Sequence, residues 1–172
     1  MADEEEGGNK YHFVTENGES KTMSRGYTGK ASASYPNGDV YEGDFLDGIR
    51  EGRGVYRYGS NGDKYDGEWR QNRKHGIGKM TYNGKGEYQG YWENGRRHGE
   101  GVFTYPNGDV YSGWWRFGEK EGTGTYSSKS TKMKMYGDWE NGEMKQGRWE
   151  YPNGVFFEGE FENNKPSGRG YW

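Results

Sequence analysis

Two histidine motifs and a series of carboxylates are the residues of this sequence that could do acid–base or metal chemistry. His75 and His98 end two basic triplets at equivalent places in the chain, and their backbones are expected about 10 Å apart on neighbouring hairpins. No carboxylate is placed as a third ligand, so this spacing does not favour a metal site. Glu42 and Asp44 are expected to face water, whereas a general acid near neutral pH needs burial. The sequence therefore predicts neither a metal site nor a catalytic residue.

Motifs for phosphate binding and for nucleophilic catalysis are missing from the sequence. The Gly-x-Gly pairs never extend to Gly-x-Gly-x-x-Gly, and no Gly-x-x-x-x-Gly-Lys-Ser/Thr occurs. The chain has no cysteine, and its serines have no histidine and aspartate placed to activate them. These absences predict a protein that is not an enzyme and that binds no cofactor.

Two basic triplets are the clearest candidates for a binding surface. They consist of Arg73, Lys74 and His75 and of Arg96, Arg97 and His98. We expect both triplets at the tips of neighbouring loops, where they form a basic stripe along one edge of the molecule. Such a stripe would attract an acidic protein surface or anionic lipid. Ordinary solubilising loop charge is the alternative interpretation.

Nucleic acid is excluded as a partner by the acidic surroundings of the aromatic residues. A stacking platform for bases needs exposed rings beside a positive groove. Here the rings have acidic neighbours, as in the segment 41–44 (Tyr-Glu-Gly-Asp), and the net charge of the chain is −3. Membrane lipid is not favoured either, because the sequence has no amphipathic helix and no lipidation motif.

The composition shows what kind of fold must position these residues. Only 28% of the 172 residues are hydrophobic, while 33 are glycine and 17% are aromatic. There are too few aliphatic residues for a conventional two-layer core, and no apolar run approaches the roughly 20 residues of a membrane helix. Disordered chains are poor in aromatic residues, so disorder does not explain the composition. Packing must come from aromatic rings laid against glycines.

A repeat of about 23 residues runs through most of the chain. In one copy, Tyr88, Gly90 and Trp92 alternate and are followed by Gly99 and Gly101. The same frame recurs in phase, and its structural spine is expected to consist of Tyr65, Gly67, Trp69, Tyr88, Gly90, Trp92, Tyr111, Gly113, Trp115 and Trp139. The copy after residue 135 departs from the frame, because it lacks one residue and one glycine. The polar segment Ser127–Lys134 replaces a turn.

The spacing within each copy predicts β-hairpins. Tyr-x-Gly-x-Trp has period two, which puts the three residues on one face of a strand. Gly95–Gly99 is expected as a short hairpin loop, and Asn-Gly turns link one hairpin to the next. The fold is therefore predicted to be all-β, an elongated single-layer antiparallel ribbon of stacked hairpins. Residues 1–26 are expected to be an acidic, irregular N-terminal segment and cap, and residues 27–172 to be an array of about six repeats, the first and last partial.

The shared aromatic face is a second candidate for partner binding. The tryptophans at equivalent positions are expected to be mostly an internal packing spine. Tyr58, Tyr82 and Tyr105 are expected to contact a partner, because tyrosines left partly exposed in a groove are common interface anchors.

The frame Tyr-x-Gly-x-Trp/Phe-x-x-Gly-x-x-x-Gly-x-Gly resembles the MORN repeat. Within that class, the chain looks most like the radial spoke head MORN subunits of motile cilia and flagella. The likeness rests on Gly29–Phe45, on the Lys/Arg-His-Gly motifs and on Phe157–Tyr171.

This resemblance implies stacked MORN hairpins and a non-enzymatic scaffold subunit in the axonemal radial spoke head, supporting ciliary motility. It implies a cytoskeletal location in the axoneme and partners that are other subunits of a large ciliary assembly. It leaves open whether the chain forms a homodimer. The alternative is a peripheral membrane adaptor that binds anionic phospholipid through basic hairpin loops.

Overall fold

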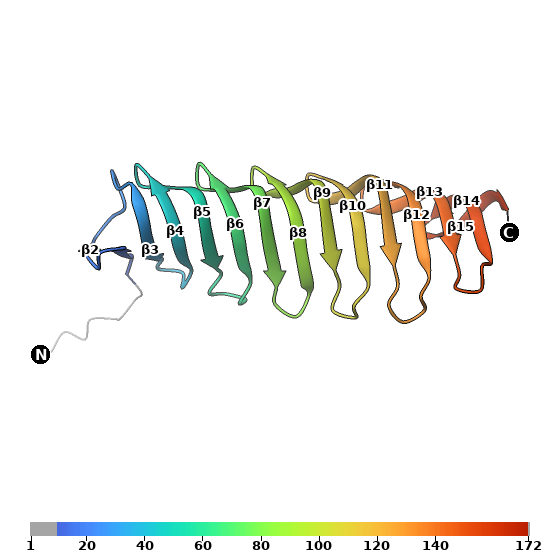
Figure 1. Ribbon diagram of the computed structural model, residues 1–172, viewed down its shortest axis with the longest axis horizontal. Helices are drawn as coiled ribbons and strands as arrows, with labels where there is room; N and C mark the ends of the chain where they lie inside the picture. Colours follow the sequence, from blue (N-terminus) through green and yellow to red (C-terminus); the bar gives the residue numbers. More distant parts are fainter. Residues whose placement is uncertain (1–9, 172) are drawn as a thin grey trace, which may run out of the picture.

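Consecutive hairpins build one open antiparallel sheet. A computed structural model describes residues 10–171, in which 15 strands follow one another along a ribbon (Figure 1). The strand order follows the chain from β15 back to β3 and then ends with β1 and β2. The strands are β1 (His12–Thr15), β2 (Ser20–Lys21), β3 (Gly29–Ser34), β4 (Val40–Leu46), β5 (Ile49–Arg57), β6 (Lys64–Arg70), β7 (Arg73–Tyr82), β8 (Gly86–Glu93), β9 (Arg96–Thr104), β10 (Val110–Arg116), β11 (Glu119–Ser127), β12 (Lys134–Glu140), β13 (Glu143–Glu150), β14 (Phe156–Glu162) and β15 (Lys165–Tyr171). This confirms the predicted all-β ribbon.

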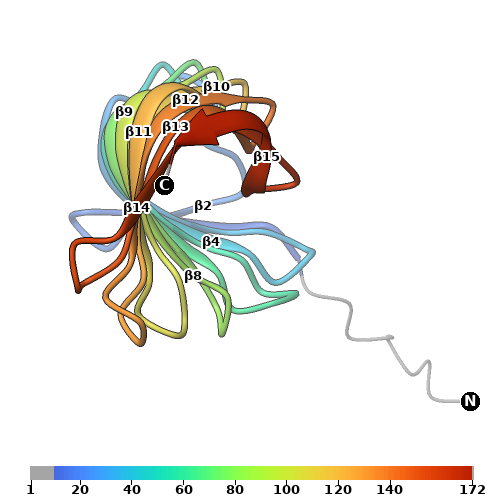
Figure 2. The same cartoon turned by 90° about the vertical axis from the view of Figure 1, so that its right-hand side faces the viewer.

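The N-terminal cap predicted over residues 1–26 falls partly outside the described residues. From residue 10 onward, β1 pairs with β3 and β2 pairs with β1, so this segment extends the sheet by two short strands. Viewed along the long axis, the sheet curves into an arch and successive hairpins rotate relative to one another (Figure 2). Such rotation is expected from the right-handed twist of β-strands.

A row of glycines crosses the middle of the sheet, and its members pair across neighbouring strands. Gly90 of β8 lies opposite both Gly78 and Gly101. A Cβ atom on Gly90 would lie 2.5 Å from the Cα of Gly101, and one on Gly101 would lie 2.5 Å from ring carbons of Tyr88. The glycines are therefore required by close backbone contact in one strand and by a tyrosine ring in the next. This agrees with the prediction that packing comes from aromatic rings laid against glycines.

Each hairpin ends in a tight two-residue turn, followed by a β-bulge. Asn94 and Gly95 both have positive φ (48° and 86°), which is the conformation of a type I′ turn. Residues 96–99 belong to β9, so the prediction that Gly95–Gly99 is a loop was wrong. The reason is the bulge. Trp92 pairs with Arg97 while Gly90 pairs with Gly101, so that strand β9 carries extra residues here. The sequence period gives no sign of these residues.

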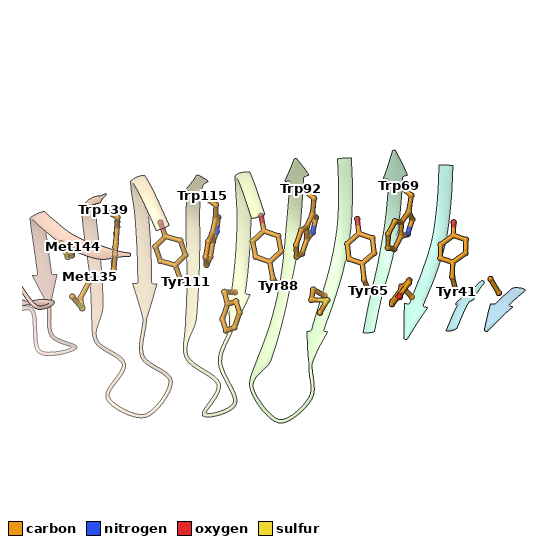
Figure 3. Close-up of a cluster of buried hydrophobic side chains, with 14 of the residues drawn as sticks. Tyr41, Tyr65, Trp69, Tyr88, Trp92, Tyr111, Trp115, Met135, Trp139 and Met144 are labelled. Atoms are coloured by element: carbon orange, nitrogen blue, oxygen red, sulfur yellow. The ribbon is translucent and has the colours of Figure 1, made fainter. Parts of the chain in front are cut away.

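The aromatic core lies on one face of the sheet, where tyrosine and tryptophan rings alternate along the ribbon (Figure 3). Tyr88 meets Trp92 and Trp115 edge to face, with ring centroids 5.2 Å apart in both pairs. Its hydroxyl donates to the carbonyl of Tyr91 at the bulge, and Trp92 Nε1 donates to the carbonyl of Gly78. The aromatic members of the predicted spine are buried. They are Tyr65, Trp69, Tyr88, Trp92, Tyr111, Trp115 and Trp139.

The unusual segment Ser127–Lys134 forms an ordinary repeat connection. The amide of Ser128 donates to Met133 and that of Lys132 to Ser128, as those of Tyr58 and Gly62 donate in an earlier turn. Lys132 takes a positive φ of 60°, where the earlier turn has glycine. The basic stretch therefore keeps the stacking of hairpins continuous.

Candidate partner-binding face

Four basic side chains lie along the aromatic face, one in each of four successive hairpins. We call Arg50, Lys74, Arg97 and Lys120 the cation row. Each is paired across its hairpin with the ring at the bulge, as Lys74 is with Trp69 and Arg97 with Trp92. The tight turn aligns each of them with its ring, because the second residue after the turn pairs with the second residue before it, which is the aromatic one.

Every member of the cation row stacks on the tryptophan of the following hairpin. The charged group of Lys74 lies 4.5 Å from the ring centroid of Trp92, and that of Arg97 lies 4.5 Å from Trp115. Arg50 over Trp69 and Lys120 over Trp139 have similar distances, 4.6 and 4.9 Å. A cation over the face of a ring is attracted by the ring quadrupole. The row therefore links each hairpin to the next.

Backbone contacts hold these residues in place. The carbonyl of Lys74 accepts a hydrogen bond from the amide of Gly95 in the next turn, and the carbonyl of Arg97 accepts one from Gly118. Each tight turn thus rests on the cationic residue of the hairpin before it. The positions of the charges are fixed by the stacking of the repeats.

No member of the cation row has an acidic partner within ion-pair distance among residues 10–171. Arg50 donates to the carbonyl of Asn72 and Arg97 to that of Gly118. The ammonium groups of Lys74 and Lys120 have no hydrogen-bond acceptor in the described part of the chain, and neither is a fully buried atom. Both ammonium groups therefore touch solvent.

Burial of the two lysines makes their charges costly. Desolvation, together with repulsion from Arg97, lowers the pKa of Lys74 from 10.5 to about 8. The same two causes lower the pKa of Lys120 to about 8. An anion placed beside either ammonium group would offset part of this cost.

Three tyrosines predicted to contact a partner lie on the same face as the cation row. Tyr58, Tyr82 and Tyr105 are partly buried against the core. Lys74 lies 5.8 Å from the ring of Tyr58, and Lys120 lies 5.5 Å from that of Tyr105. A hollow of about 230 Å³ opens between Arg50 and Lys74 beside Tyr58. The role of the three tyrosines in partner binding stays a prediction.

The expectation that the two basic triplets form loop tips was wrong, because both lie at the starts of strands. Lys74 and Arg97 turn toward the aromatic face, and the residues next to them along each strand point away from it. His75 contacts the ring of Tyr91, and His98 contacts Phe117 and approaches Glu93. Arg73 and Arg96 are exposed. The predicted basic stripe is thus divided, and the sequence analysis missed that Arg50 and Lys120 belong with Lys74 and Arg97.

The turns that join the hairpins carry aspartates near the cation row. The carboxylate of Asp39 accepts hydrogen bonds from Tyr56 and from the amide of Gly59. Asp109 is bonded in the same way to Tyr126 and to the amide of Lys129. These hydrogen bonds outweigh burial and hold the pKa of both carboxyls below the usual range. The aspartates are occupied in shaping the turns and form no ion pair with the row.

The opposite face of the sheet is a shallow trough whose floor is the glycine row. It has a volume of about 1110 Å³, and Ile77, Val102 and Trp114 line it with Gln89 and Ser112. Ile77 and Trp114 are 55% and 48% exposed. The alternating carboxylates of the sequence predict a solvated acidic face at these outward positions, so an apolar trough was not expected there.

The described residues do not group three His, Asp or Glu side chains in a way that could hold a metal ion. Residues 10–171 contain no helix that is long and apolar enough to cross a bilayer. Glu42, one of the carboxylates weighed for acid–base chemistry, pairs with Arg57 on the surface. Asp44 accepts a hydrogen bond from the amide of Arg53.

Comparisons with known proteins agree with this architecture. The TCP domain of SAS-4 (dCPAP) from Drosophila melanogaster, solved with a proline-rich motif of Ana2 (dSTIL), is similar in fold with a TM-score of 0.50. The two chains share 12% identity over 88% of this chain and 77% of that one. Curated protein sequences give no significant match.

A family comparison covers more than half of the sequence. The MORN repeat matches residues 41–63, 65–86, 88–110, 111–131 and 157–171. These spans coincide with the hairpins that carry the glycine row and the aromatic core. The chain therefore belongs to the MORN repeat family, whose members are generally non-catalytic scaffolds for protein interaction or membrane binding.

Proposed function

We propose that this protein is a non-enzymatic scaffold subunit of the axonemal radial spoke head and that it supports ciliary and flagellar motility. In this role it binds other protein subunits of a large ciliary assembly. Its membership of the MORN repeat family and the resemblance of its opening and closing segments to radial spoke head MORN subunits support the proposal.

The observation that carries the scaffold role is the repetition of one binding unit along a continuous sheet. Each of four hairpins presents a cation stacked on a tryptophan, with partly buried tyrosines beside it. Equal units at fixed intervals favour multivalent contact with an elongated partner. The sheet, which hydrogen-bonds from β2 to β15, holds these units in register.

An extended segment of a protein partner fits this surface. The structure of the similar TCP domain was solved in complex with a proline-rich motif. Partners of that kind bind with little loss of conformational entropy, because they are already extended. We propose that this chain also takes an extended segment.

The membrane-adaptor alternative has less support. The membrane-adaptor alternative rests on the expectation of basic residues at the hairpin tips. The tight turns consist instead of neutral, acidic or aromatic residues. They are Asp47-Gly48, Gln71-Asn72, Asn94-Gly95, Phe117-Gly118, Asn141-Gly142 and Asn163-Asn164. A flat bilayer surface would meet these tips before it reached the half-buried cation row.

Affinity purification of the tagged chain from ciliated cells tests the proposal. After a high-salt wash, we expect spoke components of the axoneme among the proteins identified by mass spectrometry. The control is the same tagged chain in cells without cilia. Failure to recover axonemal proteins, together with membrane association at low salt that fades as ionic strength rises, would favour the adaptor instead.

A further inference from the structure

We infer that the cation row is a binding site for an acidic polyproline II segment that carries a carboxylate at every third residue. This inference rests on the proposed scaffold function and names the chemistry of the partner. The segment would lie along the ribbon axis, with one carboxylate beside each of Arg50, Lys74, Arg97 and Lys120.

The charge of the ligand follows from the unpaired cations. None of the four has an ion-pair partner among the described residues. The carboxylates of the nearby turn aspartates Asp39, Asp63 and Asp109 already accept hydrogen bonds from turn amides and side chains. Unpaired charges at the edge of an apolar face gain most from an incoming opposite charge, because the dielectric constant is low there.

The spacing of the row fixes the spacing of the carboxylates. Successive cations are two strands apart, as from β5 to β7 and from β7 to β9, which is about 9.6 Å at 4.8 Å per strand. A polyproline II helix has three residues per turn and rises about 3.1 Å per residue, or about 9.3 Å per turn. Every third side chain therefore returns to the same side at nearly the interval of the repeat.

Other peptide conformations do not match the row. In a β-strand, alternate residues face the same side, so residues three apart point in opposite directions. In an α-helix the side chains that return to one face are seven residues apart, which is about 10.5 Å and longer than the interval of the row. Only the polyproline II form combines the interval with a single face.

The site offers aromatic rings that can contact prolines, in addition to cations that can bind carboxylates. Tyr58, Tyr82 and Tyr105 lie beside the cations with their rings partly exposed. Grooves lined by aromatic rings bind polyproline II segments through the faces of the prolines. The hollow between Arg50 and Lys74, bordered by Tyr58 and Trp69, gives room for one such contact.

The site ends where the sequence departs from the repeat. In β13 the position of the cation is taken by Met144, which pairs with Trp139 and is fully buried. The row therefore offers four positions, enough for a segment of about ten residues. Met144 also shows that the fold accepts methionine at this position.

Fluorescence anisotropy with two synthetic peptides tests the inference. One peptide is Glu-Pro-Pro repeated four times, and the other has the same residues with the four glutamates placed together at one end. We expect the periodic peptide to bind the full chain about tenfold more tightly than the block peptide at moderate salt. Equal binding of the two peptides, or no binding of either, would overturn the inference.

A pair of matched variants ties the binding to the cation row. Lys74→Met with Arg97→Met should weaken binding of the periodic peptide at least about tenfold, and Met144 indicates that both should fold. The control, Lys64→Met with Arg70→Met, removes one lysine and one arginine that are exposed, lie outside the row and belong to neither basic triplet. It should leave binding within about twofold. Equal losses in both variants would show that only net charge matters, and would overturn the site.

Anionic vesicles distinguish a lipid ligand from a peptide. The vesicles consist of phosphatidylcholine with about one third phosphatidylserine. The row is a headgroup site if the chain binds these vesicles, if Lys74→Met with Arg97→Met abolishes that binding, and if the chain binds the periodic peptide no more tightly than the block peptide. That result would overturn the inference. The outcome for the scaffold proposal is distinguishable from the outcome for the polyproline II site. If axonemal proteins co-purify but the two peptides bind equally, the scaffold stands and only the polyproline II register is wrong.

Discussion

At the scale of single residues, the fold depends on glycines that face either backbone or a tyrosine ring. Gly90 lies against the backbone of Gly101, and Gly101 lies against the ring of Tyr88. The hydroxyl of Tyr88 then donates to the carbonyl of Tyr91, which lies at the bulge. Each repeat packs its single sheet through these same contacts. A side chain added at one of the glycines should therefore disturb several contacts together.

Gly90→Val should destabilise the protein by about 3 kcal/mol, because the new side chain overlaps the neighbouring strand. Glu93→Ala is the matched change in the same strand. The Glu93 carboxylate makes only a surface approach to His98, so the change should stay within about 0.5 kcal/mol. Denaturant unfolding of both variants checks this. Equal midpoints would contradict the requirement for glycine.

The buried lysines predict how stability depends on pH. The pKa of Lys74 and of Lys120 is about 8 in the folded chain against 10.5 when exposed. Between these values the unfolded chain binds more protons, so stability should rise with pH. The rise ends near pH 10, because burial raises the pKa of the tyrosines, Tyr65 and Tyr88 among them, and ionised tyrosine favours unfolding.

The groups that face Lys74 are Tyr58, Tyr65, Trp92, Arg97 and Asp63. Those that face Lys120 are Tyr105, Tyr111, Tyr126, Trp139, Arg97 and Glu119. The tyrosines among them keep their protons in this range, because burial raises the pKa of each above 10. Urea unfolding at several pH values should therefore show the rise in the wild type and lose it in Lys74→Met with Lys120→Met. If stability still rises with pH in this variant, the rise comes from other groups.

At the scale of elements, the hairpin is set by a tight turn and a bulge. The type I′ turn favours Asn and Gly because both central residues have positive φ. Asn94 and Asn141 occupy its first position in two hairpins, whereas Phe117 occupies it in another with φ 49°. A bulky residue in this conformation is strained.

Phe117→Asn should therefore stabilise the chain by about 0.5 to 1 kcal/mol, although it removes contacts of Phe117 with His98 and Arg116. Since Phe117 is 59% exposed, little apolar burial is lost. Thermal unfolding should show a higher midpoint. A lower midpoint would mean that the ring contacts outweigh the strain of the turn.

The hairpins could be predicted from the sequence, but their bulges could not. Period-two spacing of Tyr65, Gly67 and Trp69 identifies the strand and its buried face, as observed. The extra residues of the paired strand become visible only in the cross-strand register. This is why Lys74 and Arg97 were expected in loops. In four successive repeats a basic residue stands five positions after the ring that follows Tyr-x-Gly-x, from Phe45 and Arg50 to Trp115 and Lys120, and this sequence pattern indicates the cation row.

At the scale of the whole molecule, the ribbon behaves as a one-dimensional array. Strands make their main contacts with the strands beside them in the sheet. In such arrays stability is the sum of repeat and neighbour terms. Long-range order then comes from stacking, and it keeps the cations of the row at a constant interval.

A chain that ends at Ser127 should consequently stay folded with reduced stability. It loses the stacking of Lys120 and Tyr111 on Trp139, but the hairpins before it keep their neighbours. Circular dichroism and urea unfolding should show β-structure, an earlier midpoint and a smaller m-value. Complete loss of structure would contradict the additive account and indicate one cooperative core.

The central claim is that protein partners bind the aromatic face through the cation row. Its most direct test compares three tagged chains in ciliated cells: the wild type, Lys74→Met with Arg97→Met, and Lys64→Met with Arg70→Met. All three should fold, as judged by circular dichroism. We predict that axonemal proteins co-purify with the wild type and the Lys64/Arg70 variant and are lost from the Lys74/Arg97 variant. Equal recovery with all three chains would contradict the claim.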